Sequence, residues 1–155
     1  MSETAANARS QRAASDSEDL VRVGPGTAMG ELMRRYWIPA LLSNELDAGG
    51  SPVRLALLGE RLVAWRSPNG DVGVMDHRCP HRNASLFFGR NEEAGLRCVY
   101  HGWQFDARGK CVDTPNVPLA HACPQKVRSR GYAVREEKGL VWVYMGDPAT
   151  HPPLP

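Results

Sequence analysis

The sequence predicts a mainly β domain built from antiparallel sheets. The chain has 155 residues, 42% of them hydrophobic, which suits one ordinary domain with its own core. Its 15 glycines and 12 prolines favour turns and short strands over long helices. From Pro52 onward, short apolar runs recur between Gly, Pro, Asn and Asp residues, as is typical of an antiparallel barrel or sandwich.

The first 50 residues contain a predicted tail and a predicted helix. Residues 1–20 are polar and rich in Ala and Ser, so we expect a disordered tail. A Gly-Pro-Gly break precedes Thr27, a suitable N-cap, and apolar residues at helical spacing follow as far as Trp37. Pro39 is expected to stop this helix, and a short helical turn is expected at 43–46.

Strands are expected at the short apolar runs, each bounded by turn residues. The strongest turn signal is Ser67-Pro68-Asn69-Gly70. A charged turn is expected at 135–139. The predicted strands lie at 53–58, 62–65, 72–75, 96–100, 103–105, 110–112, around 127, at 132–134 and at 140–144.

Composition and charge exclude several classes of function. A net charge of +2 is too small to indicate a nucleic-acid partner. No apolar stretch approaches the roughly 18 residues that a membrane-spanning helix needs, so we expect no membrane span. The N-terminus lacks the basic and apolar regions of a secretory signal, so we expect a cytoplasmic protein with reduced cysteines.

Two short motifs, Cys79-x-His81 and Cys98-x-x-His101, carry the candidate chemistry. Each supplies one thiolate and one imidazole, ligands that select zinc or iron–sulfur chemistry. Zinc fingers usually pair two cysteines in one loop and two histidines in another, whereas here each loop holds one of each. This mixed pattern is typical of a Rieske [2Fe–2S] cluster. We therefore predict Cys79 and Cys98 on one iron, and His81 and His101 on the other.

The alternatives are a structural zinc site and a chance occurrence of the pattern. Chance is the weaker alternative, because two such Cys–His pairs each lie inside a predicted turn. Cys111 and Cys123 have no histidine partner in a motif and are interpreted as ordinary reduced cysteines. Trp103 is interpreted as packing over a cluster loop rather than as an electron path. The other histidines, His77, His121 and His151, are interpreted as loop or linker side chains. The arginines near the loops form a candidate docking face, whose positive charge is reduced by acidic neighbours. They are Arg78, Arg82, Arg90 and Arg97.

The two motif loops within 76–82 and 98–103, with the segments 23–39, 84–90 and 139–146, resemble the oxygenase (α) subunits of Rieske non-haem iron aromatic-ring oxygenases of the phthalate dioxygenase-like group. The resemblance covers everything except the tail. It implies an ISP-like Rieske domain of antiparallel sheets with a small cluster-binding subdomain, plus an N-terminal helix.

The resemblance also implies a function and partners. A flavin/iron–sulfur reductase or a ferredoxin would deliver electrons to the [2Fe–2S] cluster. The cluster would relay them to a mononuclear Fe(II), held by two histidines and a carboxylate, in an aromatic-ring dioxygenase or demethylating monooxygenase. Other oxygenase subunits are implied as partners, as a homotrimer of the full-length protein.

The sequence departs from this family in two respects. The three histidines outside the motifs lack the spacing of a 2-His-1-carboxylate site, so we expect the mononuclear Fe(II) only in a missing catalytic domain. The predicted organisation is a tail (1–20), a Rieske domain (21–147) and a proline-rich start of a linker (148–155), with a stand-alone Rieske ferredoxin as the alternative. The extra loop cysteines of respiratory Rieske proteins are absent, which predicts a low potential, near −150 mV.

Overall fold

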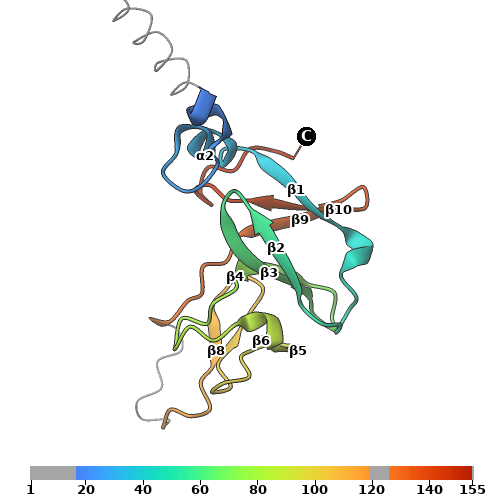
Figure 1. Cartoon of the computed structure of the whole chain (residues 1–155). Helices are drawn as coiled ribbons and strands as arrows, with labels where there is room; N and C mark the ends of the chain where they lie inside the picture. The colour runs from blue at the N-terminus through green and yellow to red at the C-terminus, as the bar shows by residue number, and fades with distance from the viewer. Residues whose placement is uncertain (1–16, 119–125, 155) are drawn as a thin grey trace, which may run out of the picture.

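The computed structural model describes residues 17–118 and 126–154. His121, Cys123 and most of the predicted tail lie outside the described residues, so the predicted domain boundaries stay predictions. The described part consists of small antiparallel sheets with short helices (Figure 1), which confirms the predicted mainly β fold. None of its helices has the length and apolar character needed to cross a membrane.

Three sheets make up the described part of the chain (Figure 1). The first has the order β1 (Trp37–Leu42), β10 (Leu140–Tyr144) and β9 (Ala133–Glu137). The second has the order β2 (Val53–Leu57), β3 (Glu60–Arg66) and β4 (Val72–Asp76). The third, called the small sheet below, has the order β5 (Arg90–Glu92), β6 (Gly95–Arg97), β7 (Gln104–Phe105) and β8 (Cys111–Asp113). It lies at one end of the molecule.

The helix predicted after Thr27 is shorter than the sequence predicts. Thr27 caps α2 (Ala28–Met33) as expected, since its Oγ1 accepts a hydrogen bond from the backbone N–H of Gly30. The helix ends at Met33, and the prediction that it reaches Trp37 is wrong, because Trp37–Leu42 form β1. Pro39 is tolerated there because β1 is an edge strand that pairs only with β10, with a register shift directly after the proline.

The remaining strands lie close to their predicted positions, with four differences. The prediction of a strand at 96–100 is wrong beyond Arg97, because β6 ends there and a turn follows. The strand β5 is missing from the prediction because its Arg-Asn-Glu sequence has no apolar alternation. Residues 135–137 belong to β9, so the predicted charged turn shrinks to Lys138 and Gly139, both at positive φ (54° and 76°) as a two-residue hairpin requires. Val127 lies outside the named strands, and the predicted helical turn at 43–46 is found as η1 (Ser43–Glu45).

The strand β3 separates two apolar cores. Alternate side chains of a strand point to opposite faces, so Leu62 and Ala64 enter one core while Val63 and Trp65 enter the other. The upper core joins β3 to the sheet of β1, β10 and β9 and contains Leu46, Leu58, Leu62, Ala64, Val74, Val141, Val143 and Met145. The lower core joins β3 and β4 to the small sheet and contains Val63, Trp65, Met75, Cys79, Leu86, Leu96, Cys98, Phe105 and Cys111.

A buried ion pair fastens α2 to β3. The Arg34 guanidinium lies 2.6 Å from Glu60 Oε1, and both side chains are largely buried, at 9% and 13% exposed. The second Glu60 oxygen accepts hydrogen bonds from the Tyr132 hydroxyl and from Arg130. Burial alone raises the pKa of Glu60, but these three donors outweigh it and hold the pKa below its usual value.

A second arginine fastens β3 to β9. Both terminal nitrogens of Arg66 lie 2.8 Å from the Glu136 carboxylate oxygens, and its Nε donates to the carbonyl of Leu46. This two-point contact lowers the pKa of Glu136 to about 2. The first two sheets are therefore joined by charge as well as by the upper core.

Replacing Glu60 with glutamine is expected to lower the free energy of unfolding by about 3 kcal/mol, because the Arg34 charge stays buried without its counterion. Chemical unfolding of the holoprotein measures this loss. Glu137→Gln, an exposed change on β9 outside the ion pairs of the described residues, is the matched control and should change stability little. Equal losses in both variants would contradict the assignment.

Lowering the pH is expected to remove the contribution of Glu136 to the stability of the folded chain. Because its pKa is lower in the folded chain than in the unfolded chain, the stabilisation is fully present above about pH 5 and disappears as the pH falls towards about 2. The difference in Tm between the wild type and Glu136→Gln should therefore shrink between these pH values. A difference in Tm that does not change with pH would show that the pair with Arg66 contributes no linked stability.

Candidate metal centre

Two hairpin loops of the same backbone design carry the predicted ligands. In the first loop (Cys79–Ala84), the Cys79 N–H donates to the Ala84 carbonyl (2.8 Å) and the Cys79 carbonyl accepts from Asn83 (2.8 Å). In the second loop (Cys98–Trp103), the Cys98 N–H donates to the Trp103 carbonyl (2.8 Å), and its carbonyl accepts from Gly102 (3.0 Å). Each cysteine thus opens a six-residue loop that its own two backbone groups close.

The residues next to the loops repeat this equivalence. An antiparallel pair closes each loop, Arg78 with Ser85 in the first and Arg97 with Gln104 in the second. The fifth residue of each loop has a left-handed backbone, with φ of 57° at Asn83 and 75° at Gly102. Asparagine tolerates this conformation better than most residues, and glycine adopts it freely. A Cβ at position 102 would also lie only 2.8 Å from Pro115 Cγ, so glycine is required there.

The two cysteines of the motifs meet in the lower core. Cys79 and Cys98 are 1% and 2% exposed, and neither forms a disulfide. Burial raises the pKa of the Cys79 thiol, and the neighbouring Cys98 thiol raises it further. Burial thus disfavours ionisation of the Cys79 thiol, whereas a bound metal ion would stabilise both sulfurs as thiolates.

The two histidines of the motifs also meet. The ring centroids of His81 and His101 lie 4.6 Å apart, with the ring planes at 67°. His101 Nδ1 is buried and has no hydrogen-bond partner within the described part of the chain, an arrangement that is costly unless another group binds the nitrogen. Across residues 17–118 and 126–154, no three potential ligand side chains converge as they would around a single ion. The structure therefore presents one pair of thiols and one pair of imidazoles, which fits the donor set of a cluster with two unlike irons.

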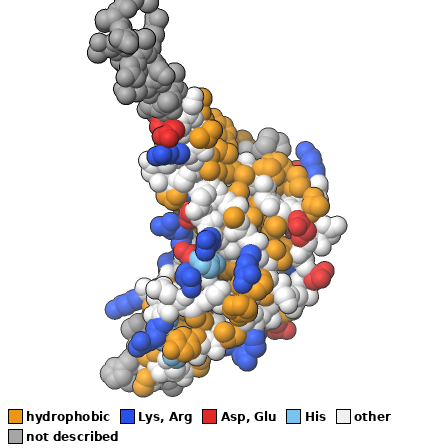
Figure 2. All heavy atoms as spheres, in the orientation of Figure 1, with side chains coloured by type: hydrophobic (Ala, Val, Ile, Leu, Met, Phe, Trp, Pro, Cys, Tyr) orange, Lys and Arg blue, Asp and Glu red, His pale blue; other side chains and the backbone are white. Residues whose placement is uncertain are grey.

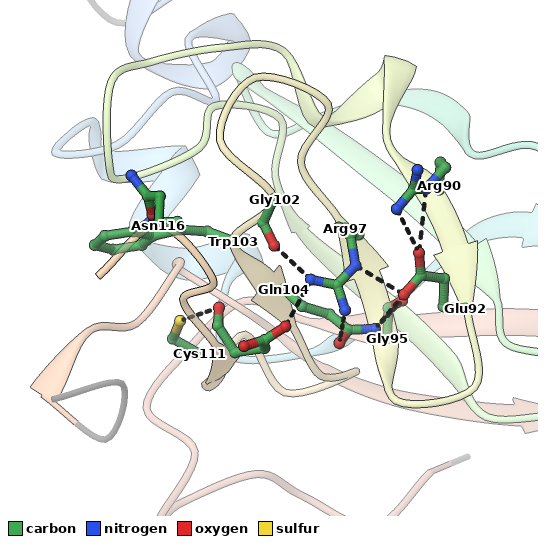
Figure 3. Close-up of polar contacts among 10 residues, drawn as sticks. Arg90, Glu92, Gly95, Arg97, Gly102, Trp103, Gln104, Cys111 and Asn116 are labelled. Carbon is green, nitrogen blue, oxygen red and sulfur yellow. Dashed lines mark hydrogen bonds and ion pairs between the residues drawn. The ribbon is translucent and has the colours of Figure 1, made fainter. Parts of the chain in front are cut away.

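Arg97 fixes the second loop to the small sheet (Figure 3). Its guanidinium donates to Glu92 (2.8 Å), to Asp113 (2.8 Å) and to the Gly102 carbonyl (2.6 Å). Its remaining nitrogen donates to Gln104 Oε1 (2.9 Å), and Gln104 in turn donates to Glu92. The hydrogen bond from Arg97 lowers the pKa of Glu92. Arg97 is thus an internal fastener and does not belong to a free docking face.

The other candidate residues have contacts of their own outside the two motifs. Cys111 is buried in β8, with its sulfur directed at the Asp113 carbonyl of the same strand (3.5 Å). His77 Nδ1 lies 3.0 Å from the carbonyl of Arg61, and His151 is exposed. Two residues that shape the loops, Asn83 and Arg97, are not predicted from the sequence. For Asn83 the one available signal is the tolerance of asparagine for left-handed backbone.

A basic groove of about 580 Å³ lies beside the first loop. Its charged and aromatic lining consists of Arg54, Arg61, His77, Arg78, Phe87 and Phe88, without a carboxylate. The Arg54 guanidinium lies 3.8 Å from the centre of the Phe87 ring, within the range of a cation–π contact. Figure 2 shows Lys or Arg side chains gathered around a histidine, beside apolar side chains, midway along the molecule. Of the four arginines of the docking face expected from the sequence, only Arg78 lines this groove.

Comparison with known proteins agrees with this geometry. Residues 36–124 match the Rieske [2Fe–2S] domain family. The chain is 66% identical over 140 residues to the 3-chlorobenzoate-3,4-dioxygenase oxygenase subunit of Comamonas testosteroni, covering 90% of this chain and 32% of that protein. It is 49% identical over 128 residues to the phthalate 4,5-dioxygenase oxygenase subunit of Pseudomonas putida, covering 82% of this chain and 29% of that one.

Solved structures show the same relationship. The crystal structure of dicamba monooxygenase bound to dicamba matches 77% of this chain and 37% of that chain, with a TM-score of 0.69 and 36% identity. The chain spans about a third of the length of the curated relatives it matches. The family match, the relatives and the paired Cys and His residues agree with one another. The chain therefore belongs to the Rieske [2Fe–2S] domain family, in the form found in the oxygenase subunits of phthalate dioxygenase-like aromatic-ring oxygenases.

Proposed function

We propose that this Rieske domain relays single electrons from a reductase or ferredoxin to a mononuclear non-haem iron in an aromatic-ring oxygenase. The observation that carries the proposal is that the same two loops supply a buried thiol pair and a pair of imidazoles, one of whose nitrogens has no hydrogen-bond partner among the described residues. The relatives that support it are oxygenase subunits, which favours a domain of such a subunit over a stand-alone ferredoxin.

The proposed ligands are Cys79 and Cys98 for one iron, and His81 and His101 for the other. The thiol pair lies in the lower core, where apolar neighbours exclude water. When bound, a Rieske cluster takes up and gives back one electron at a time. Imidazoles in place of two thiolates leave it less negative than a four-cysteine cluster, which raises its potential.

The position of the histidine pair suits exchange with a partner. The side chains that precede His101 in the second loop, Val99 and Tyr100, are 58% and 61% exposed. The cluster would therefore be anchored in the core by its cysteine side and reach the surface on its histidine side. We propose this loop tip as the place where electrons cross to another protein.

The finer assignments of partner and substrate rest on the relatives. We propose a flavin/iron–sulfur reductase or a ferredoxin as the electron donor, and further oxygenase subunits, in a homotrimer of the full-length protein, as the other partners. The names of the two relatives specify 3-chlorobenzoate and phthalate, so we propose a substituted aromatic acid as the substrate of the whole enzyme, transformed by dioxygenation or demethylation. The cytoplasmic location stays a prediction.

Spectroscopy of the purified protein tests the relay function. The reduced protein is expected to give the EPR signal of a [2Fe–2S] cluster with nitrogen ligands, and the midpoint potential is expected near the lower Rieske limit of about −150 mV. A colourless protein with one zinc ion per chain would disprove the proposed relay function. A midpoint well above 0 mV would overturn the low-potential assignment alone.

Replacing His101 with alanine is expected to abolish the histidine-ligated cluster, because one iron then keeps only one protein ligand. Iron and sulfide content, together with visible absorption, measure this loss. Cys111→Ser is the matched control, since Cys111 lies in the same core but its sulfur points at the Asp113 carbonyl. If the cysteine variant loses its cluster while the histidine variant keeps one with unchanged nitrogen couplings, the ligand assignment is wrong.

A further inference from the structure

The two loops contact each other through a stacked pair of rings. The indole of Trp103, in the second loop, lies flat on the imidazole of His81, in the first loop, with centroids 4.2 Å apart and planes within 1°. His101 meets the same imidazole close to edge-on. The plane of the first-loop histidine is therefore determined by a side chain of the second loop.

The neighbours of His81 in the first loop, Pro80, Arg82 and Asn83, are all exposed, and the stacked ring on His81 comes from the second loop. The last side-chain torsion of histidine is broad and has no sharp preference of its own. Without the indole, the imidazole would lose the stacked contact that fixes its plane, and the direction of its nitrogen atoms would be less closely defined.

A third segment fixes the indole. Trp103 Nε1 donates a hydrogen bond of 2.7 Å to Asn116 Oδ1, and the two side chains lie side by side in Figure 3. Indole nitrogen is only a donor, so the amide oxygen of Asn116 must face it. Asn116 belongs to a turn closed by a bond from the Val117 N–H to the Thr114 carbonyl (3.0 Å).

The same turn touches the second loop at the preceding residue as well. Pro115 packs so closely on Gly102 that a Cβ there would lie 2.8 Å from Pro115 Cγ. The other side of the loop is held by Arg97 through the Gly102 carbonyl. The Trp103 backbone is thus held from two directions, and its side chain has one hydrogen-bonded orientation.

We propose that Trp103 and Asn116 are positioning residues that fix the ring plane of His81, and through it the direction in which His81 presents its ligand nitrogen to iron. This inference rests on the proposed function, since it takes His81 as a cluster ligand. Groups that orient a metal ligand typically change metal affinity 10- to 100-fold when they are removed. A residue that only fills the core would affect stability without changing the histidine–iron geometry.

Pulsed EPR of the reduced holoprotein measures the nitrogen couplings of the two histidines, and the rate at which a chelator bleaches the cluster measures its retention. Trp103→Leu is expected to broaden or shift the coupling of one histidine and to accelerate bleaching about tenfold. Asn116→Ala should act in the same direction but less strongly. Trp103→Phe, which keeps a flat ring but loses the hydrogen bond to Asn116, should resemble Asn116→Ala, whereas Asn116→Asp, which keeps the acceptor, should retain the wild-type couplings.

Trp142→Leu is the matched control, because Trp142 also donates to a single oxygen, the Glu137 carbonyl, but lies on β10, outside the small sheet and both loops. It should leave the couplings and the bleaching rate unchanged. Wild-type couplings and bleaching in both Trp103→Leu and Asn116→Ala, even with a lowered Tm, would overturn the positioning role alone. If Trp103→Leu does not fold, Asn116→Ala decides the matter by itself. Absence of histidine couplings in the wild type would overturn the proposed function as well.

Discussion

The guanidinium of Arg97 is the contact on which the small sheet and the second loop depend. The four strands of that sheet are two or three residues long, too short to be stable through backbone pairing alone. Arg97 lies on β6 and contacts side chains of β5, β7 and β8, as well as the Gly102 carbonyl of the second loop. Its planar fork of five N–H donors suits such a junction, and lysine could not replace it. The same cation thus ties the loop that carries Cys98 and His101 to the small sheet.

Charge plays a similar part in the rest of the domain. Arg34 joins α2 to the start of β3, and Arg66 joins the end of the same strand to β9. Each of these arginines is mostly buried, each meets a carboxylate that comes from a distant part of the sequence, and each also donates to backbone carbonyls. Such contacts add direction to the two apolar cores, which by themselves constrain the strands less specifically. The strand β3 is fixed at both ends and covered on both faces, and the lower core joins the two loops to it.

The chemistry was easier to predict than the contacts that position it. Cys79, His81, Cys98 and His101 stand out because ligand type and spacing are properties of short segments. Trp37 was placed in a helix because apolar residues at positions 33, 36 and 37 also fit helical spacing, and only pairing with β10 decides for a strand. The strand β5 has no apolar pattern, because its edge position and its pairing with β6 come from the tertiary structure. Arg97 looked like a surface charge, since its partners Glu92 and Asp113 are brought to it by the fold.

The matching hydrogen bonds of the first and second loops fix how the sequence can vary. Each cysteine N–H reaches the carbonyl five residues on, and each flanking pair closes one residue before the cysteine and one after the loop. Inserting or deleting a single residue in either loop would break these bonds and turn the following segment to its opposite face. Exposed tip positions such as Pro80, Val99 and Tyr100 carry no such restriction, because their side chains face solvent. These hydrogen bonds therefore fix the length of each loop, and they place no demand of their own on the side chains of Pro80, Val99 and Tyr100.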